Sequence, residues 1–240
     1  METRTQAIVL HAIKYGESQL IIDMFAREQG RVSFICHLPK TSHGKIKKPY
    51  FQPLTVLDVV YDYRVSQQLQ RFKDLRISYS FTSIPFEPVK LSVALFIAEF
   101  LTYATRAEQK NEALYAYVEN SLKWLDSVSE GYANFHLVFM MRMSRFIGFF
   151  PNLSGYESGA WFDLRNGTFT RVHPIHPDYL APAEAARIGL IMRMTYENMR
   201  HFRMSRDERN RCAELMLYYY RLHVPNFPEL RSLEVLKTLF

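Results

Sequence analysis

Short apolar and alternating segments, separated by turn residues, fill the first 80 residues of the chain, and this pattern is typical of β-strands. Gly16 and Gly30 stand between such segments, where a tight turn favours a residue without a Cβ atom. Five short strands joined by tight turns favour a small closed barrel, because closure removes exposed strand edges. The expected strands are residues 7–13, 20–25, 31–36, 54–63 and 69–77.

The periodicity becomes helical beyond residues 82–88, a stretch that ends with a proline and breaks the strand pattern. Residues 91–104 are apolar on most faces, which predicts a helix buried in its own core. Ser205 followed by Glu208 predicts a capping box at the start of the last long helix, which Pro225 ends. The other expected helices are residues 113–125 and 135–149.

Positive charge is concentrated in the strand-rich part. Residues 1–80 contain 12 Lys and Arg against 7 Asp and Glu, whereas residues 81–240 contain 18 against 17. The sequence therefore predicts an α+β protein, with a basic β-barrel at residues 1–80 that binds nucleic acid and a mainly α-helical domain at residues 81–240.

The cations are densest in the connection after Cys36, which leads to Tyr50 and Phe51. Lysine attracts phosphate without sequence preference, and neighbouring aromatic rings stack on unpaired bases. A solvated loop whose lysines only aid solubility is the alternative. The predicted DNA-binding residues are Lys40, Lys45, Lys47, Lys48, Arg64, Arg71, Lys73 and Arg76.

Short motifs along the chain resemble those of one known family in order and spacing. They are Tyr15-Gly16-Glu17-Ser18, the stretch from Phe25 to Gly30-Arg31-Val32, Gln52-Pro53-Leu54 and Ala98-Glu99-Phe100-Leu101. On these motifs and the two-part layout, essentially the whole chain is similar to the bacterial recombination mediators of the RecO family.

This resemblance implies an oligonucleotide-binding (OB) fold barrel followed by a helical domain. It implies a protein that is not an enzyme and needs no cofactor or small-molecule substrate. Such a protein binds single- and double-stranded DNA and anneals complementary strands. It works with RecR to load RecA onto DNA coated with single-stranded-DNA-binding protein.

The resemblance also implies a four-cysteine zinc site in many members, after a segment like residues 148–153, yet no cysteine follows here. We expect a small hairpin subdomain at about residues 150–180 that folds without metal. Asn166-Gly167 predicts a two-residue hairpin turn within residues 161–170. The expected apolar packing comes from Tyr156, Trp161, Phe162 and Phe169.

Two basic groups in the helical part have alternative interpretations. Arg142 and Arg145, with neighbouring methionines, are candidates to bind the acidic, aromatic-ended tail of single-stranded-DNA-binding protein. In the other interpretation the methionines fill the core and the arginines pair with local acids. The second group either extends the DNA path or forms a solvated helix entrance, and it consists of Arg200, Arg203, Arg206, Arg209 and Arg211.

Other chemistry has weak support in the sequence. His173 and His176 indicate a proline-braced loop rather than a zinc site, because zinc needs three or four ligands. Asp58 and Asp62 share one face of a strand, where acids deter edge pairing, so a metal-dependent nuclease is disfavoured. An RNA-binding OB protein without mediator activity stays open. Two lone cysteines, no secretory signal and no membrane span predict a cytoplasmic protein, and the resemblance implies association with the nucleoid.

Overall fold

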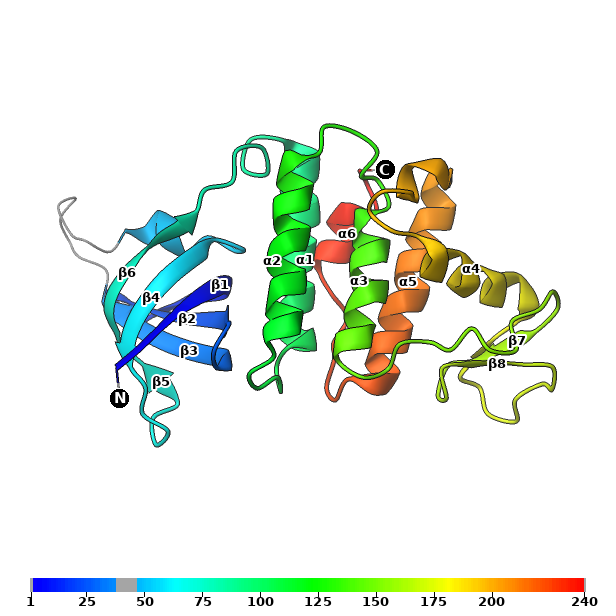
Figure 1. Cartoon of the computed structure of the whole chain (residues 1–240), viewed down its shortest axis with the longest axis horizontal. Helices are drawn as coiled ribbons and strands as arrows, with labels where there is room; N and C mark the ends of the chain where they lie inside the picture. The colour runs from blue at the N-terminus through cyan, green and yellow to red at the C-terminus, as the bar shows by residue number, and fades with distance from the viewer. Residues whose placement is uncertain (1, 38–46, 240) are drawn as a thin grey trace. The chain divides into compact units, whose positions relative to one another are not determined.

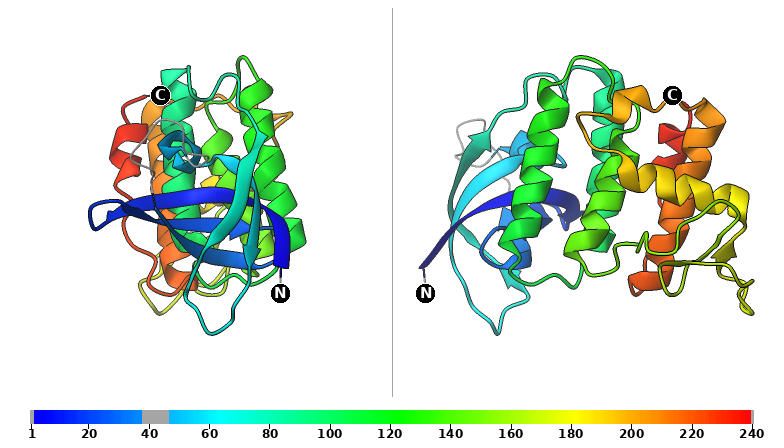
Figure 2. Two further views of the ribbon diagram at one scale, coloured as in Figure 1. Left: turned by 90° about the vertical axis from the view of Figure 1, so that its left-hand side faces the viewer. Right: turned by 45° about the vertical axis from the view of Figure 1, so that its right-hand side comes forward.

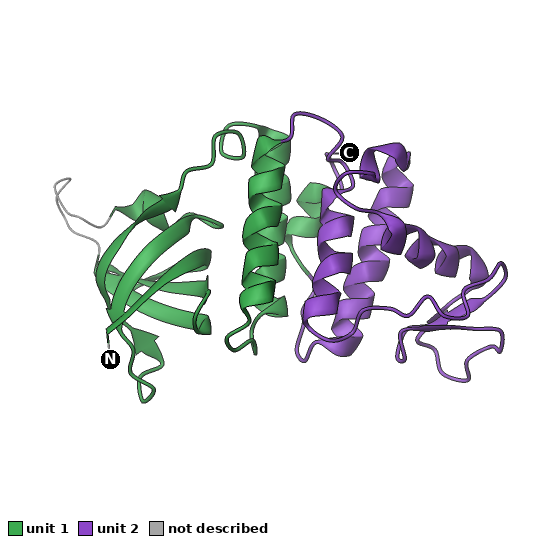
Figure 3. Ribbon diagram, in the orientation of Figure 1, with its two compact units in different colours: residues 1–127, 230–236 green, residues 128–229, 237–240 purple. Residues whose placement is uncertain are grey.

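The computed structural model describes residues 2–37 and 47–239, and its chain divides into two compact units (Figure 3). Unit 1 comprises Met1–Ser127 and Leu230–Leu236, and unit 2 comprises Val128–Glu229 and Lys237–Phe240. Strands give way to helices near residue 80, whereas unit 1 continues to residue 127. The division into domains at residue 80 stays a prediction.

The strands of unit 1 form one closed sheet (Figure 1). The order is β5-β3-β2-β1-β4-β6, in which β5 pairs parallel with β3 and β6 pairs antiparallel with β4. Only Arg71 separates β5 from β6, so one segment of chain joins both edges of the sheet and closes a barrel. The strands are β1 Glu2–Tyr15, β2 Gln19–Ala26, β3 Gly30–His37, β4 Val56–Asp62, β5 Leu69–Gln70 and β6 Phe72–Tyr79.

This topology is an OB fold and confirms the predicted α+β class. All five predicted strands are present, and the fifth is divided in two at Arg71 because each half pairs with a different neighbour. The barrel interior is apolar, and its aromatic rings pack closely: the Phe34 and Phe72 rings stack at 4.2 Å. The short 3-10 helix η1, Lys48–Phe51, adds Phe51 to this cluster, 5.9 Å from Phe72.

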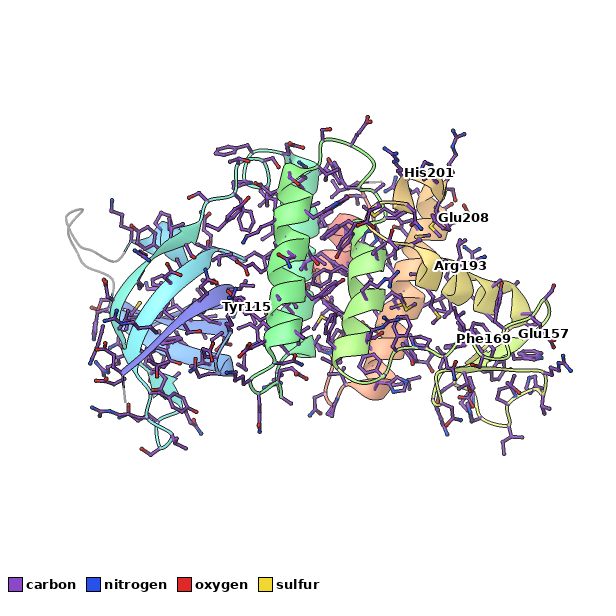
Figure 4. All side chains as sticks on the ribbon, in the orientation of Figure 1. Tyr115, Glu157, Phe169, Arg193, His201 and Glu208 are labelled. Carbon is purple, nitrogen blue, oxygen red and sulfur yellow. The ribbon has the colours of Figure 1, made fainter. Side chains whose placement is uncertain are left out.

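Unit 1 also contains the helices α1 Pro88–Ala104, α2 Glu112–Ser127 and α6 Ser232–Leu236. Both α1 and α2 lie beside the barrel (Figure 1, Figure 2). Tyr115 on α2 points toward the strands and packs against Phe25, with ring centroids 6.0 Å apart (Figure 4). Below it, the β2–β3 turn meets the α1–α2 loop: Arg31 N–H donates to the Glu108 carbonyl over 2.9 Å. The prediction that residues 91–104 form a buried helix is confirmed.

Unit 2 is built on the helices α3 Phe135–Phe146, α4 Pro182–Arg193 and α5 Arg206–His223. The predicted capping box is confirmed, since Ser205 and Glu208 each accept a hydrogen bond from the backbone N–H of the other. The sequence interpretation missed α4. A three-stranded sheet of order β8-β7-β9 completes the unit and consists of β7 Trp161–Asp163, β8 Thr168–Thr170 and β9 Tyr179–Leu180.

The hairpin β7–β8 is confirmed, but the prediction of a two-residue turn is wrong. Asp163 pairs with Thr168, so the connection has four residues, 164–167. The Asp163 carboxylate explains the longer turn, because it accepts from the backbone N–H groups of Arg165 at 2.9 Å and Asn166 at 3.1 Å. Gly167 then returns the chain to β8 at a φ of +64°, where a residue without a Cβ is favoured.

Candidate nucleic-acid interface

Lys47 and Lys48 introduce η1 at the surface of the barrel, and both side chains are exposed. Pro49 follows them at the helix start, and Tyr50 and Phe51 anchor the turn by packing on the barrel core. The lysines therefore extend from a fixed point. Two other predicted residues, Lys40 and Lys45, lie outside the described residues.

Arg64, Arg71 and Lys73 line one small hollow with a volume of about 200 Å³, together with Phe72 and with Asp62, the carboxylate that pairs with Lys73. The β4–β5 turn that carries Arg64 is held from below by the buried side chain of Gln70. This amide accepts from Arg64 N–H at 3.0 Å and donates to the carbonyls of Arg64 at 3.0 Å and Gln67 at 2.6 Å. The turn thus presents its arginine beside a partly exposed aromatic ring, a combination suited to a phosphate and its base.

Lys73 and Arg76 are in a different electrostatic situation, because acidic neighbours on the sheet neutralise them. Lys73 Nζ lies 2.9 Å from Asp62 Oδ1 and 3.3 Å from Glu2 Oε2, and Arg76 Nε lies 3.0 Å from Asp58 Oδ2. The hydrogen bond that Lys73 donates to the Asp62 carboxylate lowers the pKa of Asp62 and raises the pKa of Lys73. A phosphate that approached either cation would have to compete with these carboxylates.

Both neutralised cations lie in an open groove of about 760 Å³ over β1, β4 and β6. Arg4 and Arg27 also line it, and sequence reasoning did not select them. The same groove contains the carboxylates of Glu2, Glu28, Asp58 and Asp74, so its four cations face four acids. Its balanced charge makes it a weaker attractor of polyanions than the rim at Lys47, Lys48, Arg64 and Arg71. Among the residues that the structure describes, no carboxylate lies within 4.0 Å of these four side chains.

Asp58 and Asp62 do not lie on a sheet edge, contrary to the expectation from the sequence. Strand β4 pairs with β1 on one side and with β6 on the other. The two acids instead pair with the β6 cations across the sheet. Within residues 2–37 and 47–239 no three His, Cys, Asp or Glu side chains form a group that could hold a metal ion.

Arg142 and Arg145 lie on α3, and the methionines beside them are buried. Met140, Met141 and Met143 have no exposed surface, so they fill the core and are not available to an inserted ring. Arg142 donates to the Met194 carbonyl at 2.9 Å. Arg145 is exposed and lies over the Phe150 ring, 4.5 Å from its centroid. A role of the two arginines in partner binding stays a prediction.

The hairpin subdomain does not fit the four-cysteine zinc site of the resemblance. Both histidines of the subdomain are already hydrogen-bonded: His176 Nε2 lies 3.3 Å from Asp163 Oδ2, and His173 bonds the Tyr179 hydroxyl at 3.1 Å. Aromatic contacts link the strands, as expected. The Phe169 ring lies 4.9 Å from Tyr156 and 4.8 Å from Phe162.

Neither cysteine lies in a setting that would activate a thiolate. Cys36 and Cys212 are free and buried. Burial raises the pKa of the Cys36 thiol to about 11 and also raises that of Cys212. Thiol chemistry near neutral pH is therefore unfavourable at both positions.

No helix within the described ranges is both long and apolar enough to cross a membrane. Two family models match the chain: "Recombination protein O N terminal" over residues 1–81 and "Recombination protein O C terminal" over residues 85–234. Three similar proteins are each named "DNA repair protein RecO". That of Phocaeicola vulgatus is 47% identical over 240 residues, that of Bacteroides fragilis 46% over 241, and that of Flavobacterium psychrophilum 33% over 243, with 100% of both chains covered in every case. With both halves matched and the similarity extending from end to end, the chain belongs to the recombination protein O (RecO) family.

Proposed function

We propose that this protein acts in DNA repair as a recombination mediator that binds DNA through its OB barrel. The observation that carries the proposal is the set of rim cations without carboxylate partners, Lys47, Lys48, Arg64 and Arg71, on an OB barrel of a RecO family member. Phe72 beside the arginines offers a partly exposed ring to an unpaired base. Its homologues named as DNA repair proteins support the same role.

The mechanism is electrostatic and needs no bond to be made or broken by the protein. The rim cations neutralise phosphates and so reduce the repulsion between two strands, while base pairing supplies the free energy of annealing. Lys40 and Lys45 belong to this proposed site with Lys47 and Lys48. Lys73 and Arg76 contribute less, since each first has to leave its carboxylate partner. Neither ATP nor a metal takes part.

Salt dependence tests the site directly. For single strands the log–log slope changes by about 0.7 per phosphate contact, so the fourfold variant K47Q/K48Q/R64Q/R71Q should lose close to 3 units of slope. The double variant K73Q/R76Q should lose fewer units of this salt slope than the double variant K47Q/K48Q. A matched control is K110Q/K123Q, whose lysines pair with Glu28, Glu112 and Glu119 on the same unit. An unchanged slope in the fourfold variant would exclude the rim as the DNA site.

Mediator activity requires annealing of strands that are already coated. The experiment uses two complementary labelled strands, precoated with the cognate single-stranded-DNA-binding protein and free of nucleotide. We expect the protein to accelerate annealing of the coated strands. In a separate assay we expect it to act with RecR in loading RecA onto coated DNA. If naked strands are bound but coated strands do not anneal, or if RNA of the same sequence is preferred, the protein is a general nucleic-acid binder.

Arg142 and Arg145 form the proposed contact for the acidic tail of single-stranded-DNA-binding protein. Arg145 supports it, because this side chain is exposed and a guanidinium binds a carboxylate through two parallel hydrogen bonds. The buried methionines take no part. R145E should weaken binding of a synthetic acidic tail peptide without changing binding of naked DNA, and equal affinity of R145E and the parent would exclude this contact.

A further inference from the structure

A second group of exposed arginines lies in unit 2, in the connection between α4 and α5. We name residues 198–206 the arginine segment; it contains the 3-10 helix η2, Met199–His201, and the N-cap of α5. Arg200, Arg203 and Arg206 are all exposed. His201 and Glu208 mark the location of this segment in Figure 4.

The guanidinium groups of this segment have no carboxylate within 4.0 Å among the described residues. Arg200 Nε donates to His201 Nε2 at 3.3 Å, and Arg206 Nε donates to the Lys237 carbonyl at 2.8 Å. A guanidinium has five N–H donors, so each of these arginines keeps donors for a further ligand. Arg203 has no recorded partner among the residues that the structure describes.

Several other exposed arginines of the same unit are paired with acids, whereas the exposed Arg145 and Arg193 contact the Phe150 ring and the Gly189 carbonyl. Arg171 pairs with Glu157, Arg211 Nε donates to Glu184 at 2.6 Å, and Arg221 lies 3.8 Å from Glu229. Carboxylates are therefore available in unit 2 and neutralise cations elsewhere on its surface. Around the arginine segment, Asp207 and Glu208 are close in the chain, but neither lies within 4.0 Å of the three guanidinium groups.

The segment is held in place by a buried polar pair. Asn134 is 4% exposed, and its amide donates to the carbonyls of Met199 at 3.2 Å and Phe202 at 2.9 Å. Its oxygen accepts from Arg209 Nε at 2.9 Å, and Arg209 also donates to the Met204 carbonyl at 3.0 Å. Three carbonyls of a short connection are thus fixed from below. The backbone that carries the exposed arginines is therefore ordered before any ligand binds, which lowers the entropic cost of binding.

The start of α5 does not itself provide an anion site. The capping box satisfies the N–H group of Glu208 through the Ser205 hydroxyl, and it places the Glu208 carboxylate at the helix start, held by Ser205 N–H at 2.8 Å. Asp207 is exposed and supplies one opposing charge. The attraction of the surface for an anion comes from the three guanidinium groups.

We propose that the arginine segment binds the phosphate backbone of a second nucleic-acid strand. The inference rests on the proposed function, because a protein that holds one strand on the barrel and one on unit 2 brings two strands together by itself. Arginine suits the task, since its planar fork matches two phosphate oxygens. The surface recognises phosphates and not bases, so it accepts strands of any sequence.

The test uses the full chain and the variant R200Q/R203Q/R206Q. Its control, R171Q/R211Q/R221Q, removes the same charge from the same unit at arginines that already pair with acids. Thermal unfolding establishes that both variants fold. We expect the first variant to lose about 2 units of the log–log salt slope for single-stranded DNA, and the control to change little. Photo-crosslinking of an oligonucleotide should label a peptide that contains residues 198–206 in the parent.

The annealing rate separates the two sites. R200Q/R203Q/R206Q should anneal naked complementary strands about tenfold more slowly while its rim still binds one strand. If it anneals like the parent, or if the control loses as much, the second site is excluded. If it keeps DNA binding but loses binding of an acidic peptide, the ligand is a protein and the proposal is wrong. If annealing slows only in K47Q/K48Q/R64Q/R71Q, the rim is the sole site and the second site is excluded. If annealing slows only in R200Q/R203Q/R206Q, the arginine segment binds DNA and the proposed role of the rim is excluded.

Discussion

One contact in each unit of this protein illustrates how its chain segments are held together. In unit 1 the barrel meets its helices by close approach of backbone to backbone, where an added Cβ on Gly30 would lie 2.2 Å from the Gln109 carbonyl oxygen. In unit 2 the buried side chains of Asn134 and Asp163 hold a connection and a hairpin by hydrogen bonds. Unit 1 should therefore be sensitive to added volume at Gly30, and unit 2 to the loss of these hydrogen bonds.

The chain has two tryptophans, and one lies in each unit: Trp124 on α2 and Trp161 on β7. W161F leaves a reporter for unit 1 and W124F leaves one for unit 2. Fluorescence of these two variants during urea unfolding follows each unit separately.

The largest expected effect is that of Gly30→Ala on unit 1. The new Cβ would meet backbone atoms of both Glu108 and Gln109, and the residue would be strained at a φ of +71°. We expect a loss of about 3 kcal/mol in the free energy of unfolding reported by Trp124. Gly16→Ala is the control, because Gly16 has φ +63° and nothing within 4 Å, so only the conformational cost of about 1 kcal/mol applies. Equal losses in the two variants would contradict a close approach at Gly30.

A smaller effect is expected for Asp163→Ala in unit 2. The carboxylate accepts from the backbone N–H groups of Arg165 and Asn166 and from the Asn166 amide at 2.7 Å, and it pairs with His176. Its removal should lower the free energy of unfolding reported by Trp161 by about 2 kcal/mol, because partly buried donors lose their acceptor. Asp207→Ala removes an exposed carboxylate as a control and should cost less. If the two variants unfold at the same urea concentration, the turn does not depend on Asp163.

Much of the fold was predictable because alternation and apolar periodicity are properties of each segment alone. The strands, the buried α1 and the Ser205 capping box follow from such local patterns. Helix α4 was not predicted, since its sequence contains Gly189 and two arginines and gives only a weak stripe. The length of the β7–β8 turn depends on where the Asp163 side chain reaches, and no local rule gives that.

The candidate site was predictable in its residue types but not in its electrostatics. Lysines and arginines beside aromatic residues indicated a phosphate surface, yet pairing across strands neutralises two of them. Asp58 lies directly opposite Arg76 in the register of β4 and β6, which the sequence does not reveal without knowledge of the pairing. Arg64 and Arg71 come together because Gln70 folds the β4–β5 turn under them.

The pH response of unit 2 should depend on its buried histidine. Burial lowers the pKa of His136 on α3 to about 3, with a further contribution from Arg209, whereas the unfolded imidazole titrates near 6.5. Below pH 6.5 the unfolded chain binds a proton that the folded unit 2 does not bind. The free energy of unfolding reported by Trp161 should therefore fall by about 1 kcal/mol between pH 7 and 5.5. In unit 1, burial raises the pKa of Glu108, whereas the pKa of Asp126 is lowered because backbone N–H groups of residues 82–84 donate to it despite its burial, so protonation of the two carboxylates acts in opposite directions as pH falls.

His136→Leu tests the origin of this pH response, because it replaces the titrating imidazole with an apolar side chain of similar size. The pH slope of unit 2 between pH 7 and 5.5 should become flatter in this variant, while the slope reported by Trp124 should not change. His136→Gln is a second variant for the case that leucine impairs folding. If both variants keep the parent's dependence of unfolding free energy on pH at Trp161, another group controls the acid response of unit 2.

The smallest expected effect is that of metal removal on the hairpin subdomain. A zinc site that contributed to folding would make Trp161 sensitive to chelators, because the free energy of binding would be part of the free energy of folding. Here the side chains that approach one another are already engaged, with Asp163 in the turn and on His176, and His173 on Tyr179. Aromatic contacts of Phe169 with Tyr156 and Phe162 link the same strands without a metal. We therefore expect EDTA to leave the unfolding midpoint at Trp161 unchanged and elemental analysis to find no stoichiometric zinc. One zinc per chain, together with a lower midpoint in EDTA, would show that unit 2 uses ligands other than cysteine to keep the metal.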